Sequence, residues 1–114
     1  MLIELTKQYI DAFDTKNVIK LSDLLSDSFS IEDPVVKRIE GKSECIEAIK
    51  NIFDSCDKLN FQAKNLYLHK QTTIIEFMLQ IDDVVLEGVD IIEWKNNKMH
   101  ALRAYLDIPR KELE

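Results

Sequence analysis

The sequence predicts an α+β protein in which helices pack on one face of a curved, mostly antiparallel sheet. Two observations support this fold class. In residues 1–56 apolar side chains recur at helical spacing, and in residues 61–107 they alternate with polar side chains, as in half-buried strands. The later segments are separated by short Asp and Asn turns, which is typical of a meander of antiparallel strands.

Three N-terminal helices are expected, and the first two lie within residues 2–25. Tyr9 and Phe13 belong to the apolar stripe of the first helix, which ends at a polar Asp-Thr-Lys-Asn segment. Asn17 or Thr15 can cap the second helix, because both residue types accept hydrogen bonds from free backbone N–H groups. Leucines supply the buried face of that helix.

A short strand and a loop separate the second helix from the third. The strand, residues 29–34, should stop at Pro34, which has no backbone N–H to donate to a ladder. Residues 35–42 are predicted to form a loop closed by Gly41, after which Ser43 caps the third helix.

Four strands are predicted after the third helix. They cover residues 61–70, 72–81, 84–94 and 99–107. The turns after the second and third of these strands are an Asp-Asp pair at 82–83 and an Asn-Asn pair at 96–97. Both residue types tolerate the positive φ that tight hairpins require.

The composition predicts one domain, residues 1–114, that binds neither nucleic acid nor membranes. The net charge is −6, whereas phosphate binding needs a basic surface. No apolar run could span a bilayer, and the N-terminus lacks the apolar stretch of a signal peptide, so we expect a cytoplasmic protein. Cys45 and Cys56, both in the predicted third helix, should be buried thiols rather than a disulfide or part of a zinc site.

Asp90 has an unusual place in the strand over residues 84–94. Side chains alternate between the two faces of a strand. The face of Asp90 otherwise carries apolar residues such as Leu86, Ile92 and Trp94, while the strand's other acids point away from it. A carboxyl group on an apolar face must find a partner, or take up a proton and become neutral. Asp90 is therefore a candidate functional residue.

Five segments spread over most of the chain carry a recognisable pattern. They are residues 8–14 (Gln-Tyr-Ile-Asp-Ala-Phe-Asp), 31–34 (Ile-Glu-Asp-Pro), 41–46 (Gly-Lys-Ser-Glu-Cys-Ile), 89–94 (Val-Asp-Ile-Ile-Glu-Trp) and 101–105 (Ala-Leu-Arg-Ala-Tyr). This pattern resembles the NTF2-like, or SnoaL-like, family, and in particular its ketosteroid isomerase branch. The resemblance implies a single cone-shaped NTF2-like (cystatin-like) domain.

The resemblance also implies a catalytic site formed by Tyr9, Asp33 and Asp90. In that branch the matching tyrosine and inward-facing aspartic acid donate hydrogen bonds to a substrate carbonyl oxygen. The aspartate of the matching Glu-Asp-Pro segment moves a proton between two carbons. The ligand would be a small apolar compound with a carbonyl group, and neither a metal nor another cofactor is expected. The ligand pocket is expected to include Phe13, Phe53, Phe77, His100, Leu102 and Leu106.

Each candidate residue also has a simpler interpretation. Asp33 can be the turn residue of an Asp-Pro pair, and Tyr9 a core aromatic with its hydroxyl at the surface. Asp90 can bond to the backbone or to an arginine such as Arg103. His100 alternates with pocket residues along its strand, but a structural or rim position is the simpler expectation.

Three functions are compatible with these residues. The first is proton transfer α to a carbonyl through a dienolate, with an aspartate base and a Tyr/Asp oxyanion hole. The second is a non-catalytic module that binds a small ligand, since a fold does not fix a function. The third is a SnoaL-like cyclase or a dehydratase in which His100 cooperates with an acid. A homodimer is expected, because apolar residues on the outer face of the sheet, such as Ile74 and Ile91, need covering.

Overall fold

The computed structural model describes residues 1–33 and 37–107, which form three helices and six strands. In chain order these are α1 (Leu2–Asp14), α2 (Val18–Leu24), β1 (Leu25–Asp33), β2 (Lys37–Glu40), α3 (Lys42–Asp54), β3 (Leu59–His69), β4 (Thr72–Ile81), β5 (Val84–Lys95) and β6 (Lys98–Leu106). Pro34, which was predicted to end the first strand, lies outside the described residues.

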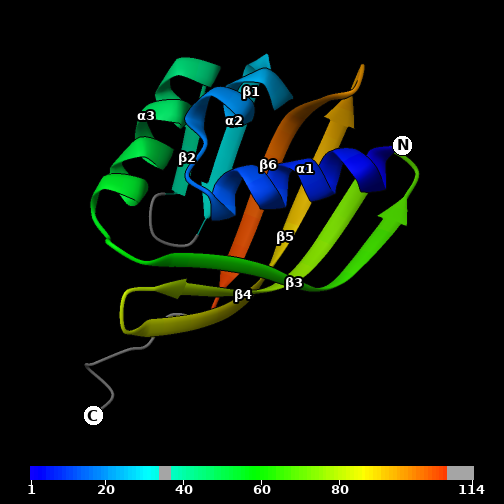
Figure 1. Ribbon diagram of the computed structural model, residues 1–114. Coiled ribbons are helices and arrows are strands. Elements are labelled where there is room, and N and C mark those ends of the chain that lie inside the picture. Colours follow the sequence, from blue (N-terminus) through cyan, green and yellow to red (C-terminus); the bar gives the residue numbers. More distant parts are fainter. Residues whose placement is uncertain (34–36, 108–114) are drawn as a thin grey trace.

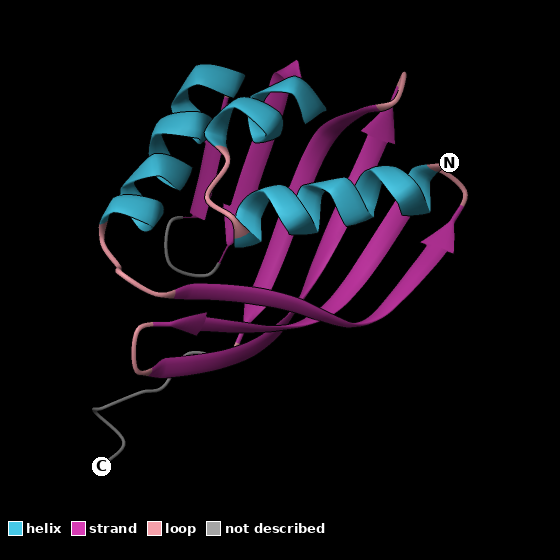
Figure 2. Cartoon of the chain, viewed as in Figure 1, coloured by secondary structure: helices cyan, strands magenta, loops and turns pink. Residues whose placement is uncertain are grey.

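All six strands belong to one sheet with the order β2-β1-β6-β5-β4-β3. Neighbouring strands are antiparallel except β1 and β6, which run parallel. The helices lie on one side of this curved sheet (Figure 1, Figure 2). The predicted α+β class and the mostly antiparallel sheet are therefore confirmed.

Two predictions for the N-terminal half need correction. The segment 35–42 is not all loop, because β2 pairs with β1 there and α3 therefore follows two strands. The N-cap of α3 is Gly41 rather than Ser43. Gly41 has a φ of +99°, which residues with a side chain rarely adopt. Asn17 caps α2 as predicted, since its side-chain oxygen accepts the backbone N–H of Lys20 at 3.1 Å.

The four C-terminal strands begin and end within two residues of their predicted bounds, and β4 matches them fully. The turns have the predicted conformation: φ is +52° at Asp82, +52° at Asn96 and +63° at Asn97. The inner face of β5 carries Asp90 among buried apolar side chains, as the alternation predicts.

A β-bulge interrupts the alternation in β6. The pairing of β5 with β6 shifts between Glu93 and Trp94. As a result Met99 and Leu102, which are three positions apart, are both buried. The face that a β6 residue occupies therefore cannot be counted straight through the bulge.

A chain of buried hydrogen bonds fixes α1 to the sheet. The indole N–H of Trp94 donates to Thr73 Oγ1 at 2.9 Å, and the hydroxyl oxygens of Thr73 and Thr6 are 2.9 Å apart. The Thr6 hydroxyl also donates to the backbone carbonyl of Leu2, one turn earlier in α1. Because Tyr9 follows Thr6 by about one helical turn, these bonds also fix the height of Tyr9 above the sheet.

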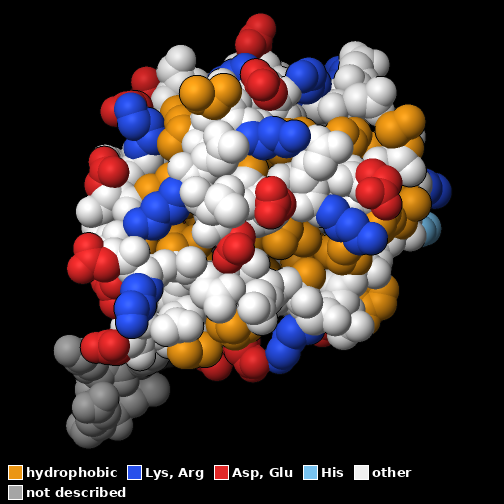
Figure 3. Space-filling model, in the orientation of Figure 1, with side chains coloured by type: hydrophobic (Ala, Val, Ile, Leu, Met, Phe, Trp, Pro, Cys, Tyr) orange, Lys and Arg blue, Asp and Glu red, His pale blue; other side chains and the backbone are white. Residues whose placement is uncertain are grey.

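The surface over the helices carries mixed charge. Figure 3 shows acidic and basic side chains interspersed with hydrophobic ones on this face, without a continuous basic area. Among the described residues, no helix is both long and apolar enough to cross a membrane. On the opposite face of the sheet, Ile74 and Ile91 are half-buried. The homodimer expected through that face stays a prediction.

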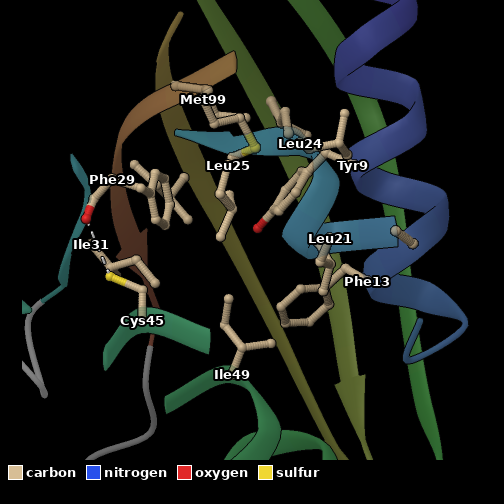
Figure 4. Packing of buried hydrophobic residues seen from close by; sticks show 14 of the residues in the cluster. Tyr9, Phe13, Leu21, Leu24, Leu25, Phe29, Ile31, Cys45, Ile49 and Met99 are labelled. Atoms are coloured by element: carbon tan, nitrogen blue, oxygen red, sulfur yellow. Dashed lines mark hydrogen bonds between the residues drawn. The ribbon is translucent and has the colours of Figure 1, made fainter. Parts of the chain in front are cut away.

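Both cysteines are buried free thiols, as predicted. Cys45 lies in α3, and its Sγ is 3.6 Å from the carbonyl oxygen of Phe29 (Figure 4). Cys56 lies beyond the end of α3, which stops at Asp54.

Replacing Thr73 by valine should lower the free energy of unfolding by about 1–3 kcal/mol. The substitution keeps the shape of the side chain but removes the acceptor, so the buried indole N–H of Trp94 loses its hydrogen bond. Urea unfolding followed by Trp94 fluorescence would measure the loss. Thr72→Val, one position earlier on the opposite face of β4, is the matched control, and an equal loss in both variants would contradict the role of Thr73.

Candidate active site

An apolar cavity of about 100 Å³ lies between the helices and the inner face of the sheet. Three of its lining residues are polar, and these are Tyr9, Asp33 and Asp90. The other lining residues are apolar, namely Phe13, Ile31, Ile49, Ile52, Phe61, Phe77, Leu79, Leu102, Ala104 and Leu106. The fold therefore brings the three predicted catalytic residues to one cavity.

The register of the strands explains why Asp33 and Asp90 reach the same cavity. Asp90 on β5 pairs with Ala104 on β6. On the other side of β6, the parallel ladder pairs Glu32 with Arg103. The next position along β1, Asp33, therefore lies beside Ala104 as well. The two acids flank β6 at the same level, about 10 Å apart across two strand spacings, with the small side chain of Ala104 between them.

Asp90 is almost fully enclosed, with 4% of its surface exposed. Within residues 1–33 and 37–107 its carboxyl group makes no hydrogen bond and no ion pair. Arg103, the partner considered from the sequence, pairs instead with Glu93. Burial raises the pKa of Asp90 from its ordinary value to about 8. At neutral pH most of the carboxyl is therefore protonated and can donate a hydrogen bond.

Tyr9 reaches the cavity from α1 and is 2% exposed. Figure 4 shows its hydroxyl oxygen pointing away from α1 into the core. Its ring packs edge-on against Phe61, with ring centroids 6.1 Å apart. Burial, and to a smaller extent nearby Asp90, raises the pKa of Tyr9 well above its ordinary value, so the phenol stays protonated. The alternative with the hydroxyl at the surface is wrong.

Asp33 has a different environment from the other two polar residues. It ends β1, pairs with Lys37 of β2, and is half-buried where it lines the cavity. The Asp-Pro turn considered from the sequence includes Pro34, which lies outside the described residues. The two carboxyl groups of the cavity therefore differ in burial, one enclosed in mid-strand and the other at a strand end.

Four of the six expected pocket residues line the cavity: Phe13, Phe77, Leu102 and Leu106. Phe53 does not, because it lies behind Phe13, with ring centroids 5.0 Å apart. It supports the wall of the cavity without forming it.

His100 also lies away from the cavity, which corrects its expected place in the pocket. It borders two polar hollows instead, and its Nδ1 is 3.4 Å from Ser28 Oγ. The reason is the bulge in β6, which shifts His100 out of the alternation shared by Leu102, Ala104 and Leu106. The simpler expectation of a rim or structural histidine fits this position.

Two cavity residues with clear roles were not expected from the sequence. Phe61 packs against Tyr9 and Phe77, and the alternation along β3 could have placed it inside. Ala104 separates the two acids, but a small residue gives no signal in a hydrophobic pattern.

Comparison with known proteins places the chain in a family. A sequence model of the SnoaL-like domain matches residues 6–101. The chain belongs to the SnoaL-like domain family. The matched span of this SnoaL-like domain includes Tyr9, Asp33 and Asp90. A comparison with curated proteins finds no significant sequence match.

Solved structures share the fold of this SnoaL-like domain. An NTF2-like protein of unknown function from Cytophaga hutchinsonii superposes with a TM-score of 0.84 at 15% identity, over 100% of this chain and 96% of the other. A hypothetical protein with a ketosteroid isomerase-like fold from Catenulispora acidiphila gives 0.80 at 11% identity, over 90% and 84%. An LEH-like epoxide hydrolase from M. tuberculosis gives 0.78 at 14% identity, over 92% and 81%. At these identities the likeness establishes the NTF2-like fold alone.

Asp90 should make the domain less stable as the pH rises. The pKa of Asp90 is about 8 in the folded protein, which exceeds the pKa of an exposed aspartate in the unfolded chain. At a pH between these two pKa values, the folded protein therefore binds one more proton than the unfolded chain. The stabilisation is fully present below the unfolded pKa and is lost as the pH rises through the folded value. The slope is at most about 1.4 kcal/mol per pH unit.

Urea unfolding at about pH 5 and about pH 7 would measure this dependence. Asp90→Asn should flatten it, whereas Asp27→Asn, which alters an exposed acid on β1, should leave it as in the wild type. Equal slopes in the wild type and Asp90→Asn would mean that Asp90 is ionised in the folded protein.

Proposed function

We propose that this SnoaL-like domain is a ketosteroid isomerase-like enzyme that moves a proton α to the carbonyl group of a small apolar compound. Asp33 is the base, and Tyr9 and Asp90 donate hydrogen bonds to the carbonyl oxygen. One observation carries the proposal: a buried, mostly neutral carboxyl group shares an apolar cavity with a buried phenol and a second, less buried acid.

The reaction has two proton transfers. Asp33 takes a proton from the α carbon of a β,γ-unsaturated ketone, and the electrons of the C–H bond form a dienolate whose oxygen gains the charge. Asp33 then returns the proton to the γ carbon, and the double bond moves into conjugation with the carbonyl group. Substrate and product are isomers, so no co-reactant is consumed.

The environments of the two donors suit this charge change. Tyr9 is protonated and Asp90 is mostly protonated, so both can donate hydrogen bonds, which are stronger to an oxyanion than to the neutral ground-state carbonyl oxygen. The apolar walls keep water away and strengthen these hydrogen bonds. Asp33 and Asp90 flank Ala104, and the separation of their strands supports a substrate bound between base and oxyanion hole.

Wild-type protein should convert a β,γ-unsaturated cyclohexenone to its conjugated isomer, which the ultraviolet absorbance of the conjugated product would report. Asp33→Asn should lower kcat by at least about a hundredfold, because the amide cannot accept the proton. Tyr9→Phe and Asp90→Asn should each lower kcat by about a hundredfold or more, since each removes or changes an oxyanion donor. Asp27→Asn, on the same strand as Asp33 but outside the cavity, is the control.

The remaining outcomes separate the alternative functions. If the wild type binds the β,γ-unsaturated cyclohexenone but does not convert it, the proposal is wrong, and a non-catalytic ligand-binding module is favoured. Activity that is lost in His100→Ala but kept in Asp33→Asn would instead favour cyclase or dehydratase chemistry.

A further inference from the structure

We infer that the cavity is a single-ring site, which accepts a monocyclic ketone and excludes a ligand with a second fused ring, and that Phe77 sets this limit. The inference rests on the proposed function in one respect: that function places the ligand's oxygen at the oxyanion hole. The size limit is a property of the cavity itself, so binding measurements can test it without turnover.

The volume of the cavity imposes the first restriction. It is about 100 Å³, whereas sites for drug-sized ligands commonly have about 300–1,000 Å³. An apolar cavity of about 150 Å³ inside a protein can hold one benzene molecule. Ile52, which is 37% exposed, marks the rim of the present cavity, so part of a ring can extend toward solvent there. The enclosed volume is therefore too small for two fused rings, and one six-membered ring occupies it with an edge at this rim.

Phe77 blocks the direction in which a longer ligand would extend from Asp90. Gly88 precedes Asp90 by two positions on the inner face of β5, and it pairs directly with Phe77 on β4. A Cβ atom at position 88 would lie 2.3 Å from the backbone carbonyl oxygen of Tyr105, 2.9 Å from Phe77 Cζ and 3.2 Å from Leu106 Cδ2. The backbone of β6 and the side chains of Phe77 and Leu106 therefore close the space over the glycine. A second ring placed along β5 from Asp90 would collide with them.

Contacts with neighbouring aromatic rings restrict the movement of Phe77. Phe77 is 2% exposed, and its ring centroid is 5.0 Å from that of Phe61. Phe61 in turn lies 5.1 Å from Phe13, which packs against Phe53. In a core packed to ordinary density, displacing Phe77 would require several of these rings to shift together. The wall is therefore rigid toward a larger ligand.

Phenol and naphthol are suitable probes, because each places one oxygen on a planar ring system, as a dienolate does. Calorimetric titration of the wild type should give a Kd for phenol at least about tenfold lower than for naphthol. Phe77→Leu should tighten naphthol binding by about tenfold, since the shorter side chain removes the ring that a second ring of the ligand would meet. Phe29→Leu is the matched control: Phe29 is fully buried but is not a cavity residue, so the ratio of the two affinities should not change.

Ala104→Leu provides a second variant that fills the cavity instead of enlarging it. It should abolish phenol binding, because the larger side chain occupies the floor between the two acids.

Equal affinities for both probes in the wild type, no phenol binding by the wild type, or unchanged naphthol affinity in folded Phe77→Leu would each overturn the inference. If Phe77→Leu fails to fold, the ratio of the phenol and naphthol affinities of the wild type and the phenol binding of Ala104→Leu test the inference. Phenol selectivity without conversion of the cyclohexenone would overturn the proposed function but leave the size limit standing.

Discussion

The attachment of α1 to the inner face of the sheet is the contact on which the site depends. Near the start of the helix, Thr6 bonds to Thr73, which also accepts the indole N–H of Trp94. At the other end, Asp14 Oδ1 accepts the backbone N–H of Phe61 at 2.7 Å. Tyr9 lies between these two attachments, so its phenol cannot shift along or away from the sheet without breaking buried hydrogen bonds.

Asp90 is a poor choice of residue if stability alone is considered. Among the described residues its carboxyl group has no hydrogen-bond partner, and such a buried group costs free energy even when it is protonated, a cost that an apolar residue of similar size would not carry. The surrounding core offsets the cost, since Ile75 and Ile92 nearby are fully buried. A strongly perturbed acid in a cavity that also contains a phenol fits a functional role better than a structural one.

The alternation of side chains along the strands made much of the fold and of the site predictable from the sequence. Local irregularities in the strands limited the prediction. Asp90 could be placed on the inner face because β5 is regular through that position. His100 could not, because a bulge in β6 depends on contacts between distant parts of the chain. Gly41 was identified as the end of a loop, but its role as the cap of α3 needed the φ of +99°. The size of the cavity depends on how aromatic rings pack in three dimensions, and sequence periodicity does not encode this.

Different elements carry the chemistry and the size limit of the site. Under the proposed function the two donors come from α1 and β5 and the base from β1, while Phe61 and Phe77 on β3 and β4 form part of the cavity wall. Phe61 packs against both Phe77 and the ring of Tyr9, so the wall is in contact with one of the polar residues. A substitution at Asp33 or Asp90, by contrast, changes a polar group and removes no ring from the aromatic packing. Phe77 and the two acids lie on separate strands, so under the proposed function the accepted ligand size can change through Phe77 while Asp33 and Asp90 keep their places.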